Sequence, residues 1–354
     1  MKSLRLLAAV CAVVIANPAA AIDFGLRNQL DRINRQIAGR LLDFTHNHGV
    51  DRRIWSPALC QKRDVYVYLP PGYDPCLAYP VIFYMHGITQ DESQFIGTLV
   101  GVFDKAMACG KLPPSILVVA DGSIQGEPSL FNSGSFYINS KAGRFEDYFA
   151  CDVWDFVHAN FKIRPEREAH ALIGASMGGC GAFSLAFRRP QQYGIIVGVF
   201  PAVNLLWEDC HGRYLGNFSP CCQGYRTSVQ PHEVIARFYG GLLRVRSKTV
   251  MDPLFGRDPD SLRQVAAVNP YDLLETCDVR DGQFAMHISY GGRDEFNVDA
   301  QVESFLWRAR QRGICIGVQY DPRGHHNIES ALKYFPAAAD WLAPRLATYP
   351  PIGR

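Results

Sequence analysis

From residue 51 onward, short apolar runs alternate with longer segments in which apolar residues recur every three or four positions. Such short runs are typical of buried strands, and the longer pattern is typical of amphipathic helices. Strands are predicted at residues 65–69, 81–85, 116–120, 171–174, 195–200, 286–290 and 316–320. Helices are predicted at residues 95–108, 147–160, 177–188, 298–312 and 329–346. This order predicts an α/β fold with a mostly parallel central sheet and helices on both of its faces.

Two segments depart from this alternation. Residues 22–45 repeat leucine and isoleucine every three or four positions, which predicts an N-terminal amphipathic helix, joined by a linker up to residue 50. Residues 204–269 contain three cysteines with several glycines and prolines, and show no clear strand. An insertion of this length is typical of a functional lid, so we expect a Cys-rich cap on a catalytic domain that spans residues 51–354.

The first 21 residues have the pattern of a secretory signal peptide. Lys2 and Arg5 flank the start of an apolar run over residues 6–16, and three alanines at residues 19–21 form a small-residue cleavage site. The run is too short to cross a bilayer, and no later stretch reaches the ~20 apolar residues of a transmembrane helix. We therefore expect a secreted or periplasmic protein without a membrane partner.

Charge and cysteine content narrow the possible partners and the possible kinds of site further. The chain has 36 Lys and Arg against 34 Asp and Glu and lacks a basic run, so a nucleic-acid partner is not expected. Cleavage after residue 21 would leave ten of the 11 cysteines, and an even number in an exported chain favours disulfides. Proximity suggests pairing Cys60 with Cys76, and Cys210 with Cys221 or Cys222. The chain has no two C-x-x-C units, so disulfides are favoured over a zinc site and no metal is expected.

Residues 171–179 contain the motif G-x-S-x-G between a predicted strand and a predicted helix. So tight a turn requires a strained backbone at Ser176, and Gly174 and Gly178 leave room where a Cβ atom would collide. The strain exposes the Ser176 hydroxyl as a candidate nucleophile. The Met177 amide begins the following helix, where the helix dipole favours an oxyanion.

A serine nucleophile needs a base to take its proton and an acid to orient that base. Asp294 follows one predicted strand and His325 follows the next, and the ends of parallel strands are where α/β sheets place their sites. We expect Ser176, Asp294 and His325 to form a catalytic triad, with His325 preferred because it directly follows Gly324. The alternatives that remain open are Glu295 and Asp299 for the acid, and His326 for the base.

An oxyanion hole needs a second donor besides the Met177 amide. The turn after the strand at residues 81–85 supplies one, and we expect it to be the Ile88 amide. His86 in the same turn could be interpreted as a base. Its place before Gly87 better suits a structural hydrogen bond.

Together these motifs resemble the esterase D or "Putative esterase" family of α/β-hydrolases, which includes S-formylglutathione hydrolases, feruloyl esterase modules and mycolyltransferases. The resemblance extends from about Arg53 to Leu346. It rests on residues 65–73, His86-Gly87, residues 174–182, Arg189-Pro190, Asn269-Pro270, residues 291–294 and Gly324-His325. It implies the α/β-hydrolase fold, the triad Ser176, Asp294 and His325, and an oxyanion hole of the Ile88 and Met177 amides. The Cys-rich insertion, the N-terminal helix and the doubled histidine depart from the family pattern.

The expected function is that of a secreted serine carboxylesterase that works through an acyl-enzyme and needs no cofactor. The resemblance implies a small-molecule or carbohydrate-linked substrate that carries an acyl or hydroxycinnamoyl ester. Within the same fold, acyl transfer to a sugar or alcohol, a peptidase and a lactone esterase remain alternatives. A non-catalytic binding module is the alternative from another class.

Overall fold

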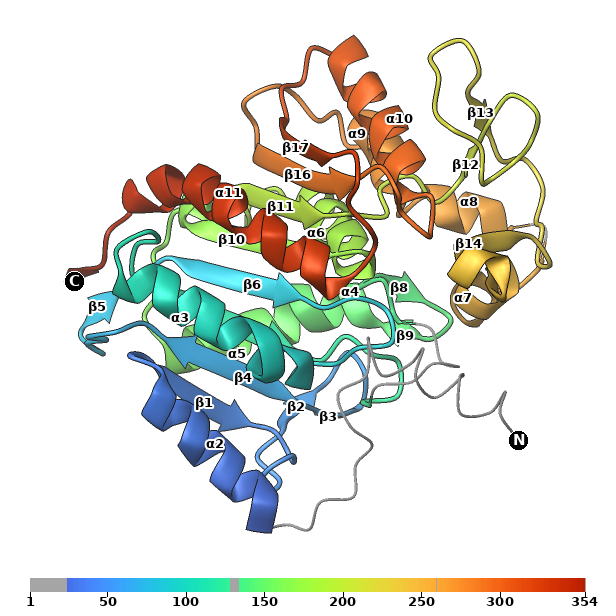
Figure 1. Ribbon diagram of the computed structural model, residues 1–354. Helices are drawn as coiled ribbons and strands as arrows, with labels where there is room; N and C mark the ends of the chain where they lie inside the picture. Colours follow the sequence, from blue (N-terminus) through green and yellow to red (C-terminus); the bar gives the residue numbers. More distant parts are fainter. Residues whose placement is uncertain (1–23, 128–133, 259, 354) are drawn as a thin grey trace.

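The computed structural model describes residues 24–127, 134–258 and 260–353 (Figure 1). The predicted signal peptide lies outside these residues. Within them, no helix combines the length and the hydropathy that crossing a membrane requires.

The core of the protein is an eight-stranded mixed sheet with the strand order β1-β4-β7-β6-β10-β11-β16-β17. Strand β4 pairs antiparallel with β1 and β7, and all other neighbours pair in parallel. The seven predicted strands and the mostly parallel sheet are thereby confirmed. Their bounds are β1 Arg40–Phe44, β4 Val65–Leu69, β6 Val81–Met85, β7 Ile116–Ala120, β10 His170–Ala175, β11 Ile195–Val199, β16 Ala285–Gly291 and β17 Gly317–Asp321.

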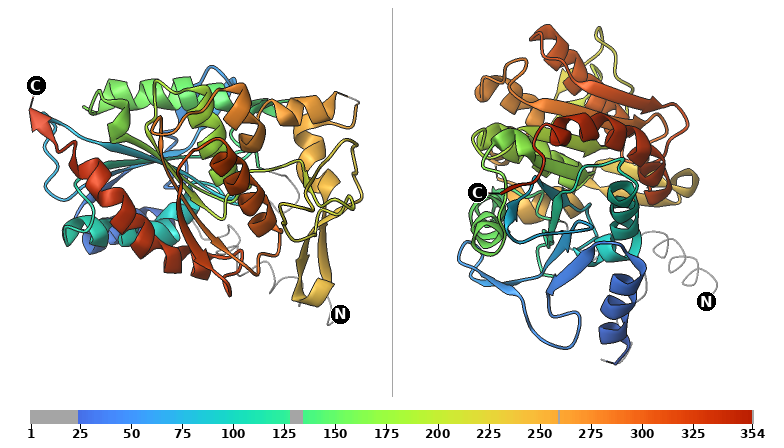
Figure 2. Two further views of the ribbon diagram at one scale, coloured as in Figure 1. Left: turned by 90° about the horizontal axis from the view of Figure 1, so that it is seen from above. Right: turned by 90° about the vertical axis from the view of Figure 1, so that its left-hand side faces the viewer.

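Helices cover both faces of the sheet (Figures 1 and 2). Side chains on α2, α3 and most of α11 join one buried cluster, and those on α5, α6 and α10 join another. Strand β4 supplies both clusters, with Val65 and Val67 on one face and Tyr66 and Tyr68 on the other, as the alternation of side chains along a strand requires. The helices are α2 Phe24–Gln36, α3 Val100–Ala108, α5 Trp154–Asn160, α6 Met177–Arg188, α10 Val298–Gln311 and α11 Ile328–Ala347.

The five predicted helices are confirmed, two of them with a π-helical first part. A π-helical turn, Phe95–Leu99, precedes α3, while α4 (Phe145–Asp147) and the π-helical turn Tyr148–Val153 precede α5. Short elements complete the fold: β2 Ile54–Ser56, β3 Gln61–Arg63, β5 Leu77–Ala78, β8 Asn139–Ser140, β9 Gly143–Arg144, the 3-10 turn Arg167–Ala169, α9 Pro270–Thr276 and β18 Ile352–Gly353.

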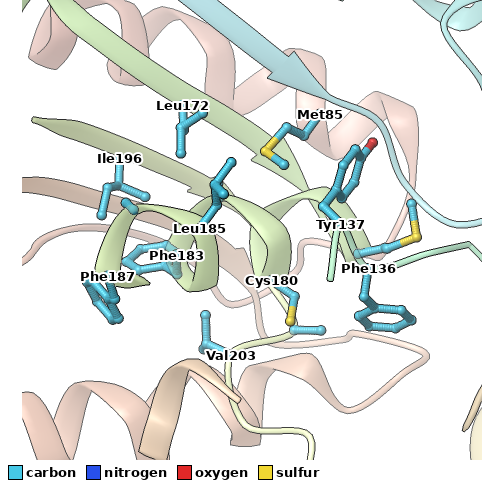
Figure 3. Packing of buried hydrophobic residues seen from close by; sticks show 14 of the residues in the cluster. Met85, Phe136, Tyr137, Leu172, Cys180, Phe183, Leu185, Phe187, Ile196 and Val203 are labelled. Carbon is cyan, nitrogen blue, oxygen red and sulfur yellow. The ribbon is translucent and has the colours of Figure 1, made fainter. Parts of the chain in front are cut away.

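Helix α6 lies near the centre of the sheet and is buried along almost its whole length. Phe183 and Leu185 face Leu172 and Ile196 of the strands beneath, and all four are almost inaccessible to solvent (Figure 3). Burying each of these side chains contributes about 1.5–3 kcal/mol. This packing fixes the helix whose first turn follows Ser176.

The N-terminal segment corrects one prediction. Helix α2 ends at Gln36, and β1 follows as the edge strand, so a helix extending to residue 45 is wrong. The side chain of Asn34 bonds both the amide and the carbonyl of Leu41, which turns the chain back along the helix. A Cβ atom on Gly39 would lie 2.4 Å from a β4 carbonyl oxygen, so the approach to the sheet depends on glycine. The segment is thus part of the sheet rather than a separate helix and linker.

The insertion at residues 204–269 contains two hairpins and two helices in its described residues. The prediction of no clear strand is wrong for β14 and β15, a five-residue and a four-residue strand that pair antiparallel. Strand β15 alternates apolar residues with arginine, and the apolar residues of β14 are interrupted by Arg237, so neither has the continuous apolar run that is typical of the buried strands of the main sheet. The elements are β12 Trp207–Glu208, β13 Gly224–Tyr225, β14 Val234–Phe238, the 3-10 turn Tyr239–Gly241, β15 Leu243–Arg246, α7 Ser247–Phe255 and α8 Ser261–Ala266.

Most of the cysteines that the structure describes are unpaired. Cys210 forms a disulfide with Cys222, one of the two pairings suggested by proximity. Cys60 and Cys76 are free and exposed, so their suggested pairing is wrong, because closeness in sequence did not bring the two thiols together. The other free cysteines among the described residues are Cys109, Cys151, Cys180, Cys221, Cys277 and Cys315.

Candidate active site

Ser176 lies at the sharp turn between β10 and α6. Its backbone has φ 56° and ψ −116°, a sparsely populated region that costs on the order of 1–3 kcal/mol. A Cβ atom on Gly174 would lie 2.0 Å from the Gly178 carbonyl oxygen, and one on Gly178 would lie 2.0 Å from the Met85 carbonyl oxygen. The predicted need for glycine at both positions is confirmed.

The imidazole that reaches Ser176 belongs to His326. Its Nε2 atom lies 2.8 Å from the Ser176 hydroxyl, and its Nδ1 atom lies 2.7 Å from a carboxylate oxygen of Asp294. A carboxylate accepts a hydrogen bond, so Nδ1 carries the proton and Nε2 is left to accept from the hydroxyl. The rings of Phe200 and Phe296 lie 4.4 Å and 4.8 Å from the imidazole and limit its rotation.

His325 does not contact Ser176, and its prediction as the triad histidine is wrong. Its Nδ1 atom lies 2.8 Å from Glu295, and 44% of its side chain is exposed. Consecutive side chains in this loop point in different directions, so the choice depends on how the loop packs. The amide of Arg293 donates to the Gly324 carbonyl, and a Cβ atom on Gly291 would lie 2.3 Å from that same oxygen. The end of β16 and the loop after β17 therefore lie in close contact, and within this loop it is His326 that faces the serine.

Asp294 occupies the position expected for the orienting acid. One carboxylate oxygen contacts His326, and the other accepts from the amides of Phe296 and Val298 at the start of α10. Only 1% of its side chain is exposed. The two alternative candidates for the acid do not take this role. Glu295 contacts His325, and Asp299 is not hydrogen-bonded to either histidine. Burial, together with the nearby Asp294 charge, raises the pKa of Asp299 to about 6.

The two expected oxyanion donors lie at one cavity. Met177 begins α6, and Ile88, Met177 and Ser176 line the same space. The turn that carries Ile88 is held by the Gly87 amide, which donates to the Gln90 side chain at 2.9 Å.

His86 is fully buried behind this turn. Its Nε2 atom accepts from the Gly122 amide at 2.8 Å, and its Nδ1 atom donates to the Gly87 carbonyl at 2.9 Å. Both ring nitrogens are therefore occupied by the backbone. The predicted structural role of His86 is confirmed.

The cavity beside Ser176 is mainly apolar and is formed largely by the cap. Arg226 and Asp252 are the charged residues in its wall, and Asp252 pairs with Arg257. Arg226 pairs with Glu233 and lies over the Tyr214 ring at 5.7 Å. The arginine is thus partly neutralised where it borders the space. The apolar lining residues of the insertion are Leu205, Leu206, Val229, Ile235, Val250, Met251, Phe255, Leu262 and Val265.

Among the residues that the structure describes, one cluster has side chains of metal-ligating types. The ligand atoms of Cys210, His211 and Cys222 lie within 4.8 Å of one another. The two sulfurs are joined in the disulfide, so neither is available as a thiolate ligand. This cluster therefore does not fit a metal ion while the disulfide is intact.

A family model described as "Putative esterase" matches residues 56–326, most of the chain, and ends at the histidine that contacts Ser176. The chain belongs to this family.

Two similar proteins of known sequence come from bacteria. An endo-1,4-beta-xylanase/feruloyl esterase of Xylanibacter ruminicola is 28% identical over 157 residues, which cover 42% of this chain and 21% of that protein. Esterase Rv1288 of Mycobacterium tuberculosis is 29% identical over 153 residues, which cover 42% and 31%. The match thus spans about a fifth to a third of these relatives.

Solved structures show the fold of this esterase family member over nearly its whole length. A ferulic acid esterase superposes with a TM-score of 0.61 at 15% identity and covers 87% of this chain and 98% of its own. An S-formylglutathione hydrolase from Agrobacterium tumefaciens superposes with a TM-score of 0.58 at 18% identity and covers 88% and 96%. The predicted α/β-hydrolase fold is confirmed.

Proposed function

We propose that this esterase family member is a serine carboxylesterase whose triad is Ser176, His326 and Asp294. The observation that carries the proposal is the unbroken chain of hydrogen bonds from the Ser176 hydroxyl through the His326 ring to Asp294. The strained turn at Ser176 and the membership of the esterase family support it. A purely structural serine would not require that strain.

The first half of the reaction forms an acyl-enzyme. The Ser176 oxygen attacks the ester carbonyl carbon while Nε2 of His326 takes the hydroxyl proton. The carbonyl oxygen becomes an oxyanion and accepts hydrogen bonds from the Met177 and Ile88 amides, each worth about 2.7–4 kcal/mol in such a site. The carbon–oxygen bond to the alcohol then breaks, and His326 returns its proton to the leaving alcohol. Asp294 holds the imidazole in the required tautomer throughout.

In the second half, water replaces the alcohol. His326 takes a proton from water as the water oxygen attacks the acyl carbon. When the tetrahedral intermediate collapses, the bond to Ser176 breaks and the serine oxygen recovers the proton from His326. The products are a carboxylic acid and an alcohol, and none of these steps requires a cofactor.

The acyl part of the substrate is apolar, either aliphatic or hydroxycinnamoyl. The apolar lining of the cavity next to Ser176 supports this choice, because a charged acyl group would lose its hydration there. The feruloyl esterase named among the relatives supports the aromatic case and a carbohydrate-linked alcohol.

The test is initial hydrolysis rates on acetyl, butyryl, octanoyl, succinyl and feruloyl esters, with wild type beside a folded Ser176→Ala variant. We expect turnover of apolar esters, little turnover of the succinyl ester, and a loss of several orders of magnitude in the variant. Fluorophosphonate labelling of wild type alone supplies an independent readout. Folded protein that neither labels nor turns over any ester contradicts the proposal, and product formed only when a sugar acceptor is added identifies an acyltransferase instead.

We further propose that the chain is exported and that its first 21 residues are removed. The Cys210–Cys222 disulfide supports export, since disulfides persist in oxidising compartments. N-terminal sequencing of protein recovered from the periplasm or medium tests this. A mature chain that retains residue 1 and stays with the cytosolic fraction contradicts it.

A further inference from the structure

The β14–β15 hairpin presents apolar side chains that ester hydrolysis does not use. Leu242 in its turn is 86% exposed, the highest value among the large apolar residues that the structure describes, and Tyr239 is 55% exposed. In the left view of Figure 2 the hairpin, drawn in gold, extends away from the sheet. Exposed apolar groups gathered at a projecting tip indicate a contact surface.

The strands behind this tip carry positive charge that the fold does not neutralise. Arg237 and Arg244 lie directly opposite each other in the antiparallel register, and both are exposed, as is Arg246. None of the three forms an ion pair with a described residue. Like charges in facing positions repel each other, so this pair lowers the stability of the hairpin unless an anion lies between them or beside them.

The surrounding sequence does not offset this charge. Residues 231–248 contain three arginines and one lysine against a single carboxylate, Glu233. That carboxylate is already bound to Arg226 in the cavity wall. The chain as a whole has a formal charge of only +2, so this hairpin is a local concentration of positive charge.

We propose that the hairpin docks on an anionic lipid surface. Leu242 and Tyr239 enter the headgroup region, and the arginines bind lipid phosphates. Apolar burial and attraction of cations to anionic lipids both strengthen interfacial membrane binding, and an apolar tip flanked by arginines combines the two. An acidic polysaccharide would satisfy the arginines but would leave Leu242 in water. The absence of a spanning segment led to the expectation of no membrane partner, but a surface hairpin needs no such segment.

The hairpin adjoins the catalytic loop. The amide of Arg237 donates to the Glu295 carbonyl at 3.0 Å, and the Phe238 ring lies 5.4 Å from Phe296. Phe296 in turn contacts His326. Docking through the tip would therefore place the active-site side of the protein beside the lipid surface, where membrane-borne esters are concentrated.

The test is co-sedimentation of the purified protein with vesicles of phosphatidylcholine that contain phosphatidylglycerol, beside vesicles of phosphatidylcholine alone. We expect binding to the anionic vesicles that weakens as salt is added. Replacing both tip residues, Tyr239→Ser with Leu242→Ser, is expected to weaken binding roughly tenfold, and so is Arg244→Gln with Arg246→Gln. Neither pair touches the triad, so turnover of a soluble short-chain ester should be unchanged.

Two matched variants lie elsewhere on the surface. Trp55→Ser removes another exposed apolar side chain, 60% exposed, and Arg32→Gln with Arg35→Gln removes two exposed arginines of α2. Both should bind vesicles as wild type does. Equal losses in tip and control variants, or binding to polygalacturonate without binding to vesicles, would overturn the proposal. Because vesicle binding is measured without catalysis, its result tests the docking proposal independently of the esterase activity.

Discussion

The Glu295 carboxylate contacts the backbone of His326 and does not contact the His326 ring. The Glu295 carboxylate accepts from the His326 amide at 2.9 Å through one oxygen and contacts the His325 ring at 2.8 Å through the other. The His326 ring is left to turn toward Asp294 and Ser176. Two adjacent histidines are thus held by two adjacent carboxylates, and only one of the histidines reaches the nucleophile.

The first prediction separates these two histidines. His326→Ala removes the imidazole that is hydrogen-bonded to Ser176 and should lower kcat by at least about a thousandfold. The matched variant His325→Ala removes a half-exposed ring that contacts Glu295 and should change kcat less than about fivefold. Steady-state kinetics on the best ester of the panel measure both. Comparable losses in the two variants would contradict the assignment of His326.

The second prediction treats Glu295 as a positioning residue. Glu295→Ala leaves the His326 amide without its acceptor and should lower kcat about tenfold with little change in KM, because the base is misplaced while the cavity is intact. Glu295→Gln keeps an oxygen that accepts from the amide and should recover most of the loss. If both variants lose activity in proportion to a lower melting temperature, the role is structural only.

The third prediction concerns Asp299. Its pKa is raised from 3.8 to about 6 by burial and by the Asp294 charge, so the folded state holds a proton that the unfolded chain has lost between those values. Its contribution to stability is fully present below pH 3.8 and is lost as the pH rises through 6, by on the order of 3 kcal/mol. Urea unfolding across this range should show Asp299→Asn free of that decline. An unchanged pH dependence in the variant would refute the raised pKa.

The fourth prediction concerns His287, whose contribution to stability changes with pH in the opposite direction. Burial lowers the pKa of His287 from 6.5 to about 4, with a smaller contribution from the Arg345 charge. The neutral ring is therefore favoured in the folded state, and its contribution is fully present above pH 6.5 and lost as the pH falls through 4. His287→Gln should be less stable at neutral pH yet lose less stability on acidification. The slope of unfolding free energy against pH distinguishes the two effects.

The fifth prediction tests the turn at Ser176. Gly178→Ala would place a Cβ atom 2.0 Å from a backbone oxygen, so we expect loss of activity together with destabilisation of several kcal/mol. Gly101→Ala in α3 has no heavy atom within 4 Å of the added carbon and should stabilise the protein by up to about 1 kcal/mol. Thermal unfolding of both variants measures this. A tolerated Gly178→Ala would show that the turn is less constrained than its geometry indicates.

Features that depend on neighbours in sequence were predictable from the chain alone. The seven predicted strands of the sheet and the helices that cover it follow from local patterns of apolar residues. The turn at Ser176 follows from glycines within two residues of it. Asp294 could be placed because it comes directly after a strand, and the end of a strand lies at a known edge of the sheet.

Only the tertiary structure decided the features that depend on contacts between distant segments. His325 and His326 have nearly the same local sequence, and the choice between them comes from the approach of Gly291 to Gly324. Residues 40–44 continue a helical pattern but pair with β4, because the edge of the sheet offers them backbone hydrogen bonds. The pairing of Cys210 with Cys222 likewise depends on how the cap folds back on itself. Local spacing determines which elements form, whereas packing determines which way a side chain in a loop points.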